Sequence, residues 1–304
     1  MRLPNFLVAG FPKCGSTSLH YYFNEHPEIF MPTQKELHFF TYDTLKLQNA
    51  GKGDKEVKKF HIGNFSEYQQ CYRDVSSEKA IGDASPSYAN YASAIPKIKA
   101  SLGDDVKIII VLRDPIKRAY SNYLHLIREE REQLPFYEAL LEEENRKKAN
   151  YSDFWYYCFN SMYADKVALI QDEFKDVLVI TFEEFIADAA DGIKSVYKFL
   201  DVDPGFVPSS IDTHFNPGGA YKKNFVTKFI FKQSKFKTII KKIIPLTPSL
   251  KKAKLKTIQR YKEATPEIDP RAENYLVQLL KNDVAKLNSF GVKTELWNDK
   301  FFIN

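Results

Sequence analysis

The chain has 304 residues and a net charge of +5, and this length is enough to bury a full hydrophobic core in one α/β domain. Its three cysteines, Cys14, Cys71 and Cys158, are too few for a disulfide framework, and their spacing suits no metal site. No apolar run approaches the ~20 residues of a membrane-spanning helix, and the N-terminus does not resemble a signal peptide. We therefore expect a cytoplasmic protein from a reducing compartment.

The first chemically informative stretch lies near the N-terminus. Residues 5–9 form an apolar run that predicts a buried strand, a glycine-bounded turn follows, and a helical pattern begins at Ser18. A helix N-terminus presents unpaired backbone N–H groups and partial positive charge, so this arrangement predicts an anion-binding site. Gly10 and Gly15 would let the loop close around an oxyanion, and the hydroxyls of Ser16 and Thr17 would add donors. The alternative is a tight turn without a ligand.

The loop differs from that of nucleoside triphosphatases at one position. Gly10, Gly15 and Thr17 match the pattern G-x-x-x-x-G-K-[ST], but Ser16 stands where the lysine belongs. The lysine of this loop is Lys13, so a kinase would lack its cation for the β- and γ-phosphates. A nucleotide kinase or other P-loop NTPase is therefore a disfavoured alternative.

An acid and an imidazole lie among aromatic residues in the next segment, after a short strand predicted at 29–31. Glu36 and His38 are two residues apart, so in an extended chain both would face the same side. By residue type alone, such a pair could take part in proton transfer. The alternative is that Glu36 caps a surface turn and His38 is an ordinary hydrogen-bonded interior group. Residues 41–65 are polar and lack periodicity, which predicts a surface excursion.

A third cluster follows the apolar run 108–112, a further predicted strand. Arg113 at its end could bind a phosphate in bidentate fashion, and Ser121 would lie roughly two turns into the helix that starts after Pro115. The alternative for Arg113 is a local ion pair with Asp114. For Arg118 the sequence leaves phosphate binding and a solvated helix face equally open.

The remaining elements complete an alternating pattern. We predict helices at 65–72, 89–101, 119–133, 136–148, 155–174, 193–200 and 270–290, and strands at about 79–84 and 177–180. The charged run 142–144 predicts a solvated helix face. Strands that alternate with helices indicate an α/β fold with a parallel sheet, whose ligands bind at the carboxyl ends of the strands.

The charge of the chain is distributed unevenly. Residues 213–262 contain fourteen Lys and Arg and no Asp or Glu, which leaves 30 basic and 39 acidic residues elsewhere. This asymmetry predicts a localised anionic partner. Apolar residues and lysines alternate at helical spacing from Phe225 onward, which suits helices at an anionic membrane surface. The alternative is core-packed helices with solvated lysines. No nucleic-acid motif accompanies the segment, so we expect no nucleic-acid partner.

Two of these motifs together resemble those of a known family, the sulfotransferases that use 3′-phosphoadenosine 5′-phosphosulfate (PAPS). The family's 5′-phosphosulfate loop is similar to Pro12, Lys13, Cys14, Gly15, Ser16, Thr17 and Ser18. Its 3′-phosphate motif is similar to Arg113-Asp114-Pro115 with Ser121. A looser resemblance to the late nucleotide loop covers Tyr221, Lys222 and Lys223.

Other segments resemble heparan-type sulfotransferases with departures. Glu36-Leu37-His38-Phe39-Phe40 is similar to their Glu-Pro-His-Phe-Phe-Asp, with Leu37 replacing the proline and Thr41 the aspartate. Residues 79–88 are similar to their Lys-Thr-Pro-Ser-Tyr strand end, but Ala84 stands at the lysine position. One contact on the acceptor side is therefore missing.

The resemblance implies a fold and a reaction. The fold would be a P-loop-type parallel sheet flanked by helices in one sulfotransferase domain, with a core to about residue 224 and a basic helical subregion at 225–304. The reaction would move a sulfuryl group from PAPS to a hydroxyl, of a carbohydrate or glycolipid, by in-line displacement without a metal. Glu36 would be the general base, Lys13 would neutralise the leaving group, and His38 would be an alternative base or an orienting partner.

The basic segment carries two further expectations about partners. Segment 225–262 would place the protein peripherally at the inner face of the membrane, next to a lipid-linked acceptor. A non-catalytic protein that uses this basic segment to bind polyanions is the alternative from another functional class.

Overall fold

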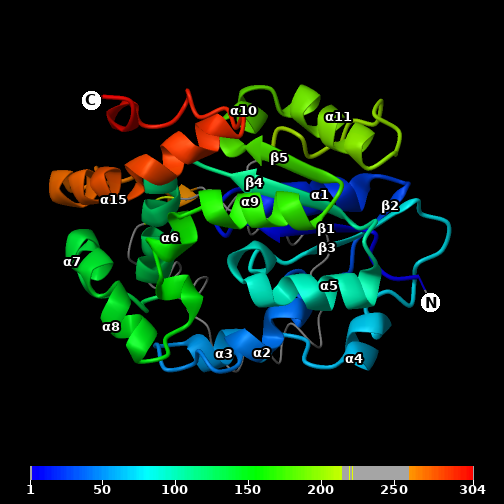
Figure 1. Cartoon of the computed structure of the whole chain (residues 1–304), viewed down its shortest axis with the longest axis horizontal. Helices are drawn as coiled ribbons and strands as arrows, with labels where there is room; N and C mark the ends of the chain where they lie inside the picture. Colours follow the sequence, from blue (N-terminus) through cyan, green and yellow to red (C-terminus); the bar gives the residue numbers. More distant parts are fainter. Residues whose placement is uncertain (1, 214–218, 220, 222–259, 304) are drawn as a thin grey trace.

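The computed structural model describes residues 2–213, 219, 221 and 260–303, and a parallel five-stranded sheet lies at its centre (Figure 1). The strands are β1 (Phe6–Gly10), β2 (Ile29–Phe30), β3 (Ala80–Ala84), β4 (Lys107–Leu112) and β5 (Val177–Thr181). Their order is β2-β3-β1-β4-β5, and every neighbouring pair is parallel. The predicted α/β fold is confirmed.

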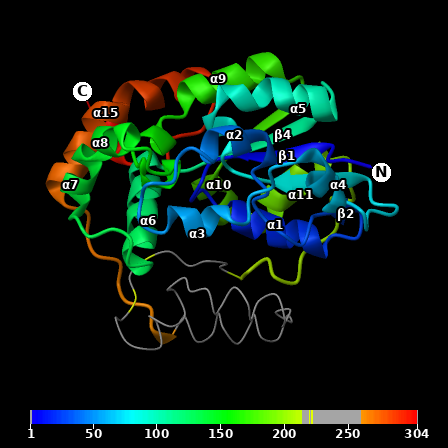
Figure 2. The same cartoon turned by 90° about the horizontal axis from the view of Figure 1, so that it is seen from below.

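The strands β1 and β4 are almost entirely apolar because helices cover both of their faces, whereas β3 carries the buried Asp83. Every residue of β1 is buried, whereas most of β5, at the edge of the sheet, is only half-buried. Helices α1 (Ser16–Glu25) and α11 (Ala189–Phe199) cover one face of the sheet (Figure 2). Helices α5 (Ile95–Leu102) and α9 (Ala164–Glu173) cover the other face.

Further helices surround the end of the sheet at which the strands have their carboxyl ends. Helix α6 (Pro115–Arg128) starts just after β4 and packs against α15 (Pro270–Ser289), which also contacts α7 and α9. The remaining helices are α2 (Tyr42–Leu45), α3 (Asp54–Lys58), α4 (Phe65–Gln70), α7 (Phe136–Leu141), α8 (Glu143–Lys148) and α10 (Phe182–Ala187). The helix predicted at 270–290 is confirmed by α15.

The long helix predicted at 155–174 is wrong. Two 3-10 turns, Asp153–Trp155 and Phe159–Ser161, come first, and α9 starts only at Ala164. A distant residue fixes this start, because the carboxylate of Asp283 on α15 accepts from the backbone N–H groups of Tyr163 and Ala164 at 2.9 and 3.0 Å. Local periodicity cannot show such a cap.

Three other helix predictions need correction. The helix predicted at 89–101 begins at Ile95, since two 3-10 turns precede it and Pro96 fits the first turn. The helix predicted at 119–133 ends at Arg128. The run 142–144 is not simply solvated, because the Glu143 carboxylate is buried and accepts from the backbone N–H groups of Cys158 and Phe159.

The predicted basic helices between 225 and 259 lie outside the described residues. Within the described part of the chain, no helix is both long enough and apolar enough to cross a membrane.

Candidate active site

A cavity of about 1130 Å³ lies at the carboxyl ends of the strands. Residues that follow each of the five strands line it, and they include all three predicted polar clusters. They are Pro12 to Ser18 after β1, Glu36 and His38 after β2, Pro86 and Ser87 after β3, Arg113 and Ser121 after β4, and Phe182 after β5. The expectation that the candidate site residues meet at one edge of the sheet is thereby supported by geometry.

The first loop wraps tightly because its glycines have no side chain. Gly15 caps the N-terminus of α1 with a φ of 101°, and a Cβ there would lie 2.8 Å from the ring of Phe182. A Cβ on Gly10 would lie 2.7 Å from the Cβ of Ala89. Helix α1 therefore begins at Ser16, and in its first turn the N–H of Ser18 donates to Gly15 O at 2.9 Å.

Two residues support this loop from the protein interior. The side chain of Cys14 is buried beside the Tyr163 hydroxyl, and burial raises the pKa of its thiol to about 11. Only the backbone of Cys14 is therefore suited to contact an anion. Arg118 is fully buried, so the solvated alternative for it is wrong. Its guanidinium donates to Pro12 O, Asn122 Oδ1, Ser161 Oγ and Tyr157 O, which are all neutral acceptors.

Cations crowd around the loop. Lys13 has a φ of 72°, and its pKa is lowered to about 7 by burial and by the neighbouring charges of Arg128 and Arg113. Arg113 donates from Nη1 to Lys13 O at 3.2 Å and lies 4.9 Å from the ring centre of Phe182. Its buried Nε has no hydrogen-bond partner among the described residues. An anion with several charges would relieve this repulsion and provide that partner.

The alternative of an ion pair between Arg113 and Asp114 is not what the structure shows. The buried Asp114 carboxylate caps α6, where it accepts from the N–H groups of Ile116 and Lys117 at 2.9 and 3.0 Å. Asp114 thus fixes the start of α6, and with it the position of Arg113 one residue earlier.

Helix α6 contributes more to the cavity than the sequence analysis expected. Ser121, His125 and Glu129 line it at intervals of four residues. Burial lowers the pKa of His125 to about 4, and the charge of Lys13 acts in the same direction. Arg128 hydrogen-bonds to His125 at 2.6 Å. The four-residue spacing of His125 and Glu129 from Ser121 is the sequence signal that could have shown that these residues share one side of the helix.

Glu36 and His38 come together, although not in the way expected. Their φ angles are 62° and 55°, so the segment has left-handed residues and is not extended. Glu36 Oε2 still lies 3.9 Å from His38 Nε2, and Glu36 Oε1 accepts from Lys35 Nζ at 2.5 Å. Burial alone would raise the pKa of Glu36, but Lys35 and His38 hold it well below its usual range. The Glu36 side chain is nevertheless 45% exposed, so it remains accessible from the cavity.

The segment after β3 holds His38 in place. His38 Nδ1 and Ser87 Oγ are 2.7 Å apart, and the backbone N–H of His38 donates to Ser85 Oγ. Ser85 in turn donates to the buried carboxylate of Asp83. The second ring nitrogen of His38 therefore faces Glu36. The ring of His61 packs against the ring of His38, with 4.3 Å between the ring centroids.

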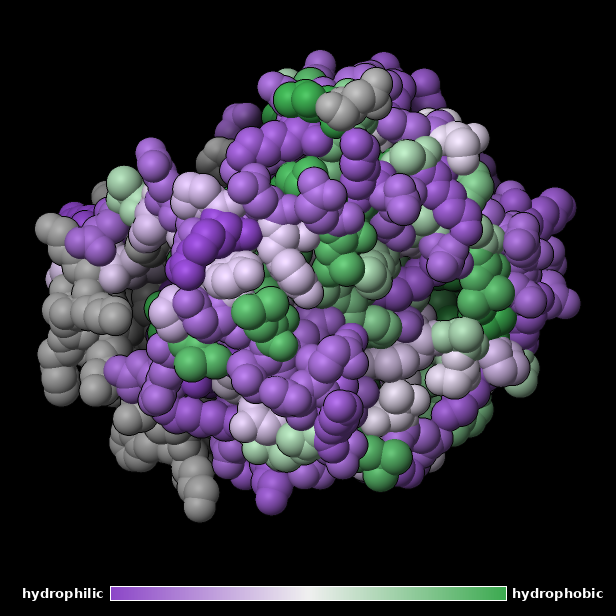
Figure 3. All heavy atoms as spheres, turned by 60° about the vertical axis from the view of Figure 1, so that its left-hand side comes forward, coloured by the Kyte–Doolittle hydropathy of each residue, from purple (hydrophilic) through white to green (hydrophobic). Residues whose placement is uncertain are grey.

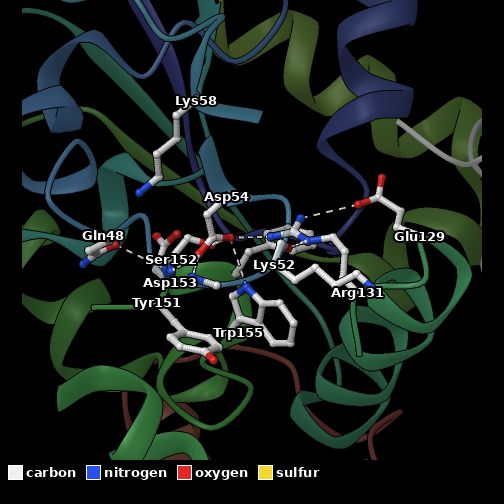
Figure 4. A network of polar contacts seen from close by, with 12 residues as sticks. Gln48, Lys52, Asp54, Lys58, Glu129, Arg131, Tyr151, Ser152, Asp153 and Trp155 are labelled. Atoms are coloured by element: carbon white, nitrogen blue, oxygen red, sulfur yellow. Dashed lines mark hydrogen bonds and ion pairs between the residues drawn. The ribbon is translucent and has the colours of Figure 1, made fainter. Parts of the chain in front are cut away.

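The segment 41–65 is not a mere surface excursion. Leu45, Asp54, Val57, Lys58 and His61 from this segment line the cavity. Figure 4 shows Asp54 joined to Arg131 after α6 and to Ser152 and Trp155. The buried Asp54 carboxylate is the ion-pair partner of the buried Arg131 and also accepts from Ser152 and Trp155. This network fixes one wall of the cavity, since Asp54, Arg131 and Ser152 all line it.

The late loop is only partly within the described residues. Tyr221 forms an antiparallel bridge with Lys262, and Lys262 lines the cavity. The centre of the Tyr221 ring lies 5.6 Å from the Arg128 guanidinium. Lys222 and Lys223 lie outside the described residues, so their roles stay predictions. Among the residues that are described, no group of three or more His, Cys, Asp or Glu could hold a metal ion.

Comparison with known proteins identifies the family. The profile of the "Sulfotransferase family" matches residues 4–205. The chain belongs to this family. The predicted family and class of enzyme are therefore confirmed. The match gives no support to the NTPase or polyanion-binding alternatives.

A solved structure and several curated sequences are similar to this sulfotransferase. The crystal structure of a sulfotransferase from Alicyclobacillus acidocaldarius superposes with a TM-score of 0.73 at 29% identity, covering 95% of this chain and 96% of that one. The "Membrane-associated sulfotransferase kil1" of Dictyostelium discoideum is 32% identical over 121 residues, 40% of this chain and 22% of the relative. Carbohydrate sulfotransferase 15 of Mus musculus is 27% identical over 170 residues, 46% of this chain and 30% of the relative. The chain thus spans less than a third of these two relatives.

Proposed function

We propose that the protein transfers the sulfuryl group of PAPS to a hydroxyl group, with Glu36 as the general base. The observation that carries this proposal is the contact between the two phosphate-binding motifs. Arg113 Nη1 donates to the backbone oxygen of Lys13 at 3.2 Å, and Glu36 lines the same cavity. One ligand with phosphates at both ends of a nucleoside would satisfy both motifs.

The residues fit such a donor. The loop N–H groups with Ser16 and Thr17 would hold the 5′-phosphosulfate, and Arg113 with Ser121 would hold the 3′-phosphate. Lys13 would neutralise the charge that develops on the bridging oxygen as its bond to sulfur breaks. A bound anion would in turn favour the charged form of Lys13. Burial and two arginines lower the pKa of Lys13 to about 7 in the free protein.

Glu36 would accept the proton of the acceptor hydroxyl as the new oxygen–sulfur bond forms. The products would be a sulfate ester and adenosine 3′,5′-bisphosphate (PAP). A general base contributes ~10²–10⁴ in rate. His38 lies within 3.9 Å of Glu36 and has its other nitrogen bound by Ser87, so it would orient the carboxylate. His38 is also the alternative base.

The acceptor in this proposal is a saccharide or glycolipid. Its support is the printed name of relatives such as the mouse carbohydrate sulfotransferase. Incubation with labelled PAPS and panels of saccharides and glycolipids would test the proposal. We expect metal-independent label transfer that Glu36→Gln abolishes. Tight, magnesium-dependent ATP binding without PAP binding by calorimetry would contradict it.

We also propose peripheral contact between segment 225–262 and the inner face of the membrane, with the rest of the protein in the cytoplasm. The support is the fourteen basic residues between 213 and 262. On the face shown in Figure 3, apolar side chains of the described residues form small separate groups among polar ones. That face offers little apolar surface to a bilayer.

Vesicle sedimentation tests this localisation. Each lysine near an anionic bilayer contributes ~1 kcal/mol, so binding should be strong to anionic vesicles, weak to neutral ones, and reduced by salt. Equal recovery in the supernatant with both lipids would leave only the interpretation of solvated lysines.

A further inference from the structure

Lys35 lies between the candidate base and the phosphosulfate loop. Its Nζ donates to Glu36 Oε1 at 2.5 Å and to Ser16 Oγ at 3.4 Å. The Lys35 side chain is 18% exposed, so most of it is packed in place. A single ammonium group thus joins the segment after β2 to the first residue of α1.

We propose that Lys35 is a second catalytic cation, which pairs with Glu36 in the free protein and turns to the transferred sulfonate when PAPS binds. The inference rests on the proposed function of this site. It gives Lys35 two linked roles: it stabilises negative charge on the sulfonate oxygens, and its departure from Glu36 makes that carboxylate a stronger base.

The first role follows from position. An anion bound at the Ser16 hydroxyl would lie beside an ammonium group that is already 3.4 Å from that oxygen. An ammonium group has three donors on a flexible stem, so Lys35 can exchange one partner for another by rotation. Lys13 is less free to do this, because it is part of the tight loop and has a left-handed backbone.

The second role follows from the charges that face Glu36. Lys35 and His38 are its close partners, while Lys13 and His61 are further neighbours with which it interacts electrostatically. Lys35 and His38 favour the ionised carboxylate, which is therefore a weak base in the free protein. When Lys35 leaves, the closest cation goes with it. Donor binding would then prepare Glu36 for the proton of the acceptor.

The chemical step is balanced. The acceptor oxygen forms a bond to sulfur, its proton moves to Glu36, and the bond between sulfur and the bridging oxygen breaks with its electron pair on the 5′-phosphate. Lys13 faces the departing oxygen, whereas Lys35 faces the oxygens that travel with the sulfur. The two lysines are therefore not redundant.

PAP and PAPS separate this proposal from a purely structural role, because PAP lacks the sulfonate. In Lys35→Ala, the loss of a charge-assisted hydrogen bond should weaken PAPS binding by roughly 10- to 100-fold and change PAP binding less than threefold. We expect kcat to fall, and Lys35→Arg to recover part of it. Lys59→Ala is the control, since Lys59 is an exposed lysine in the same connection between β2 and β3.

A titration of Glu36 by carboxyl NMR, assigned with Glu36→Gln, provides the second readout. PAPS without acceptor should raise the pKa of Glu36 in the wild type, whereas PAP should not. Equal weakening of PAP and PAPS by Lys35→Ala, or a Glu36 pKa that ignores PAPS, would overturn the role of Lys35 while leaving the proposed function intact. A wild-type protein that binds neither nucleotide would overturn both.

Discussion

Replacement of Asp54 by asparagine should destabilise the protein strongly, although the two side chains have the same shape. The Asp54 carboxylate accepts five hydrogen bonds, two from Ser152 and one each from Gly51, Trp155 and Arg131. At least two donors approach each oxygen. Either orientation of an asparagine therefore turns its NH₂ group toward donors, and the buried Arg131 loses its partner's charge.

The expected cost can be compared with that of an exposed ion pair. Removing one partner of a buried pair costs about 3–5 kcal/mol, which corresponds to a decrease in Tm on the order of 5–10 °C for a chain of this size. Asp43→Asn is the control, because Asp43 pairs with Lys46 and Lys97 at the surface and such pairs contribute ~0–1 kcal/mol.

Thermal unfolding followed by circular dichroism measures both variants. Equal Tm values for Asp54→Asn and Asp43→Asn would refute the reasoning that a buried ion pair holds this wall. If Asp54→Asn does not fold, the double variant Asp54→Asn with Arg131→Met tests whether an unpaired buried charge is the cause. It should be more stable than Asp54→Asn alone, because no unpaired charge stays buried.

Three further predictions concern the chemistry of the site. Glu36→Gln should lower kcat by ~10²–10⁴ with nearly unchanged PAP affinity by calorimetry, and retention of most activity would move the base to His38. Arg113→Ala should remove most of the preference for PAP over AMP, about 1.5–3 kcal/mol, and equal wild-type binding of the two would contradict the 3′-phosphate assignment. Since the Lys13 pKa is about 7 and a bound anion would raise it, PAP affinity should fall as the pH rises above 7. Lys13→Arg should abolish that fall, because arginine stays charged, whereas a pH-independent wild type would refute the assignment.

The parts of this fold that the sequence predicts well are those with strong local signals. The runs 6–10 and 108–112 are apolar on both faces, and the polar residues after them must lie at the carboxyl edge of a parallel sheet. The strand ends predict that Lys13 and Arg113 lie at one edge of the sheet, the family resemblance adds Ser121, and the structure brings all three to one cavity.

The features that escaped prediction depend on distant partners. A polar segment such as 41–65 looks solvated until the buried Arg131 is seen to pair with Asp54. Arg118 was ambiguous because the neutral oxygens around its guanidinium include two backbone carbonyls from separate segments, Pro12 O and Tyr157 O. Lys35 went unnoticed because a lysine beside a glutamate is ordinary in sequence, and only its second contact, with Ser16, distinguishes it.

The left-handed backbone at Lys13, Glu36 and His38 has a consequence for how this protein tolerates mutation. Glycine adopts such angles without the steric penalty that other residues incur there. At these three positions, therefore, substitution by glycine would relieve local strain at the very side chains proposed to do the chemistry. Selection for heat resistance alone should therefore favour inactive glycine variants at these three positions. A library selected for both heat resistance and activity should keep Lys13, Glu36 and His38.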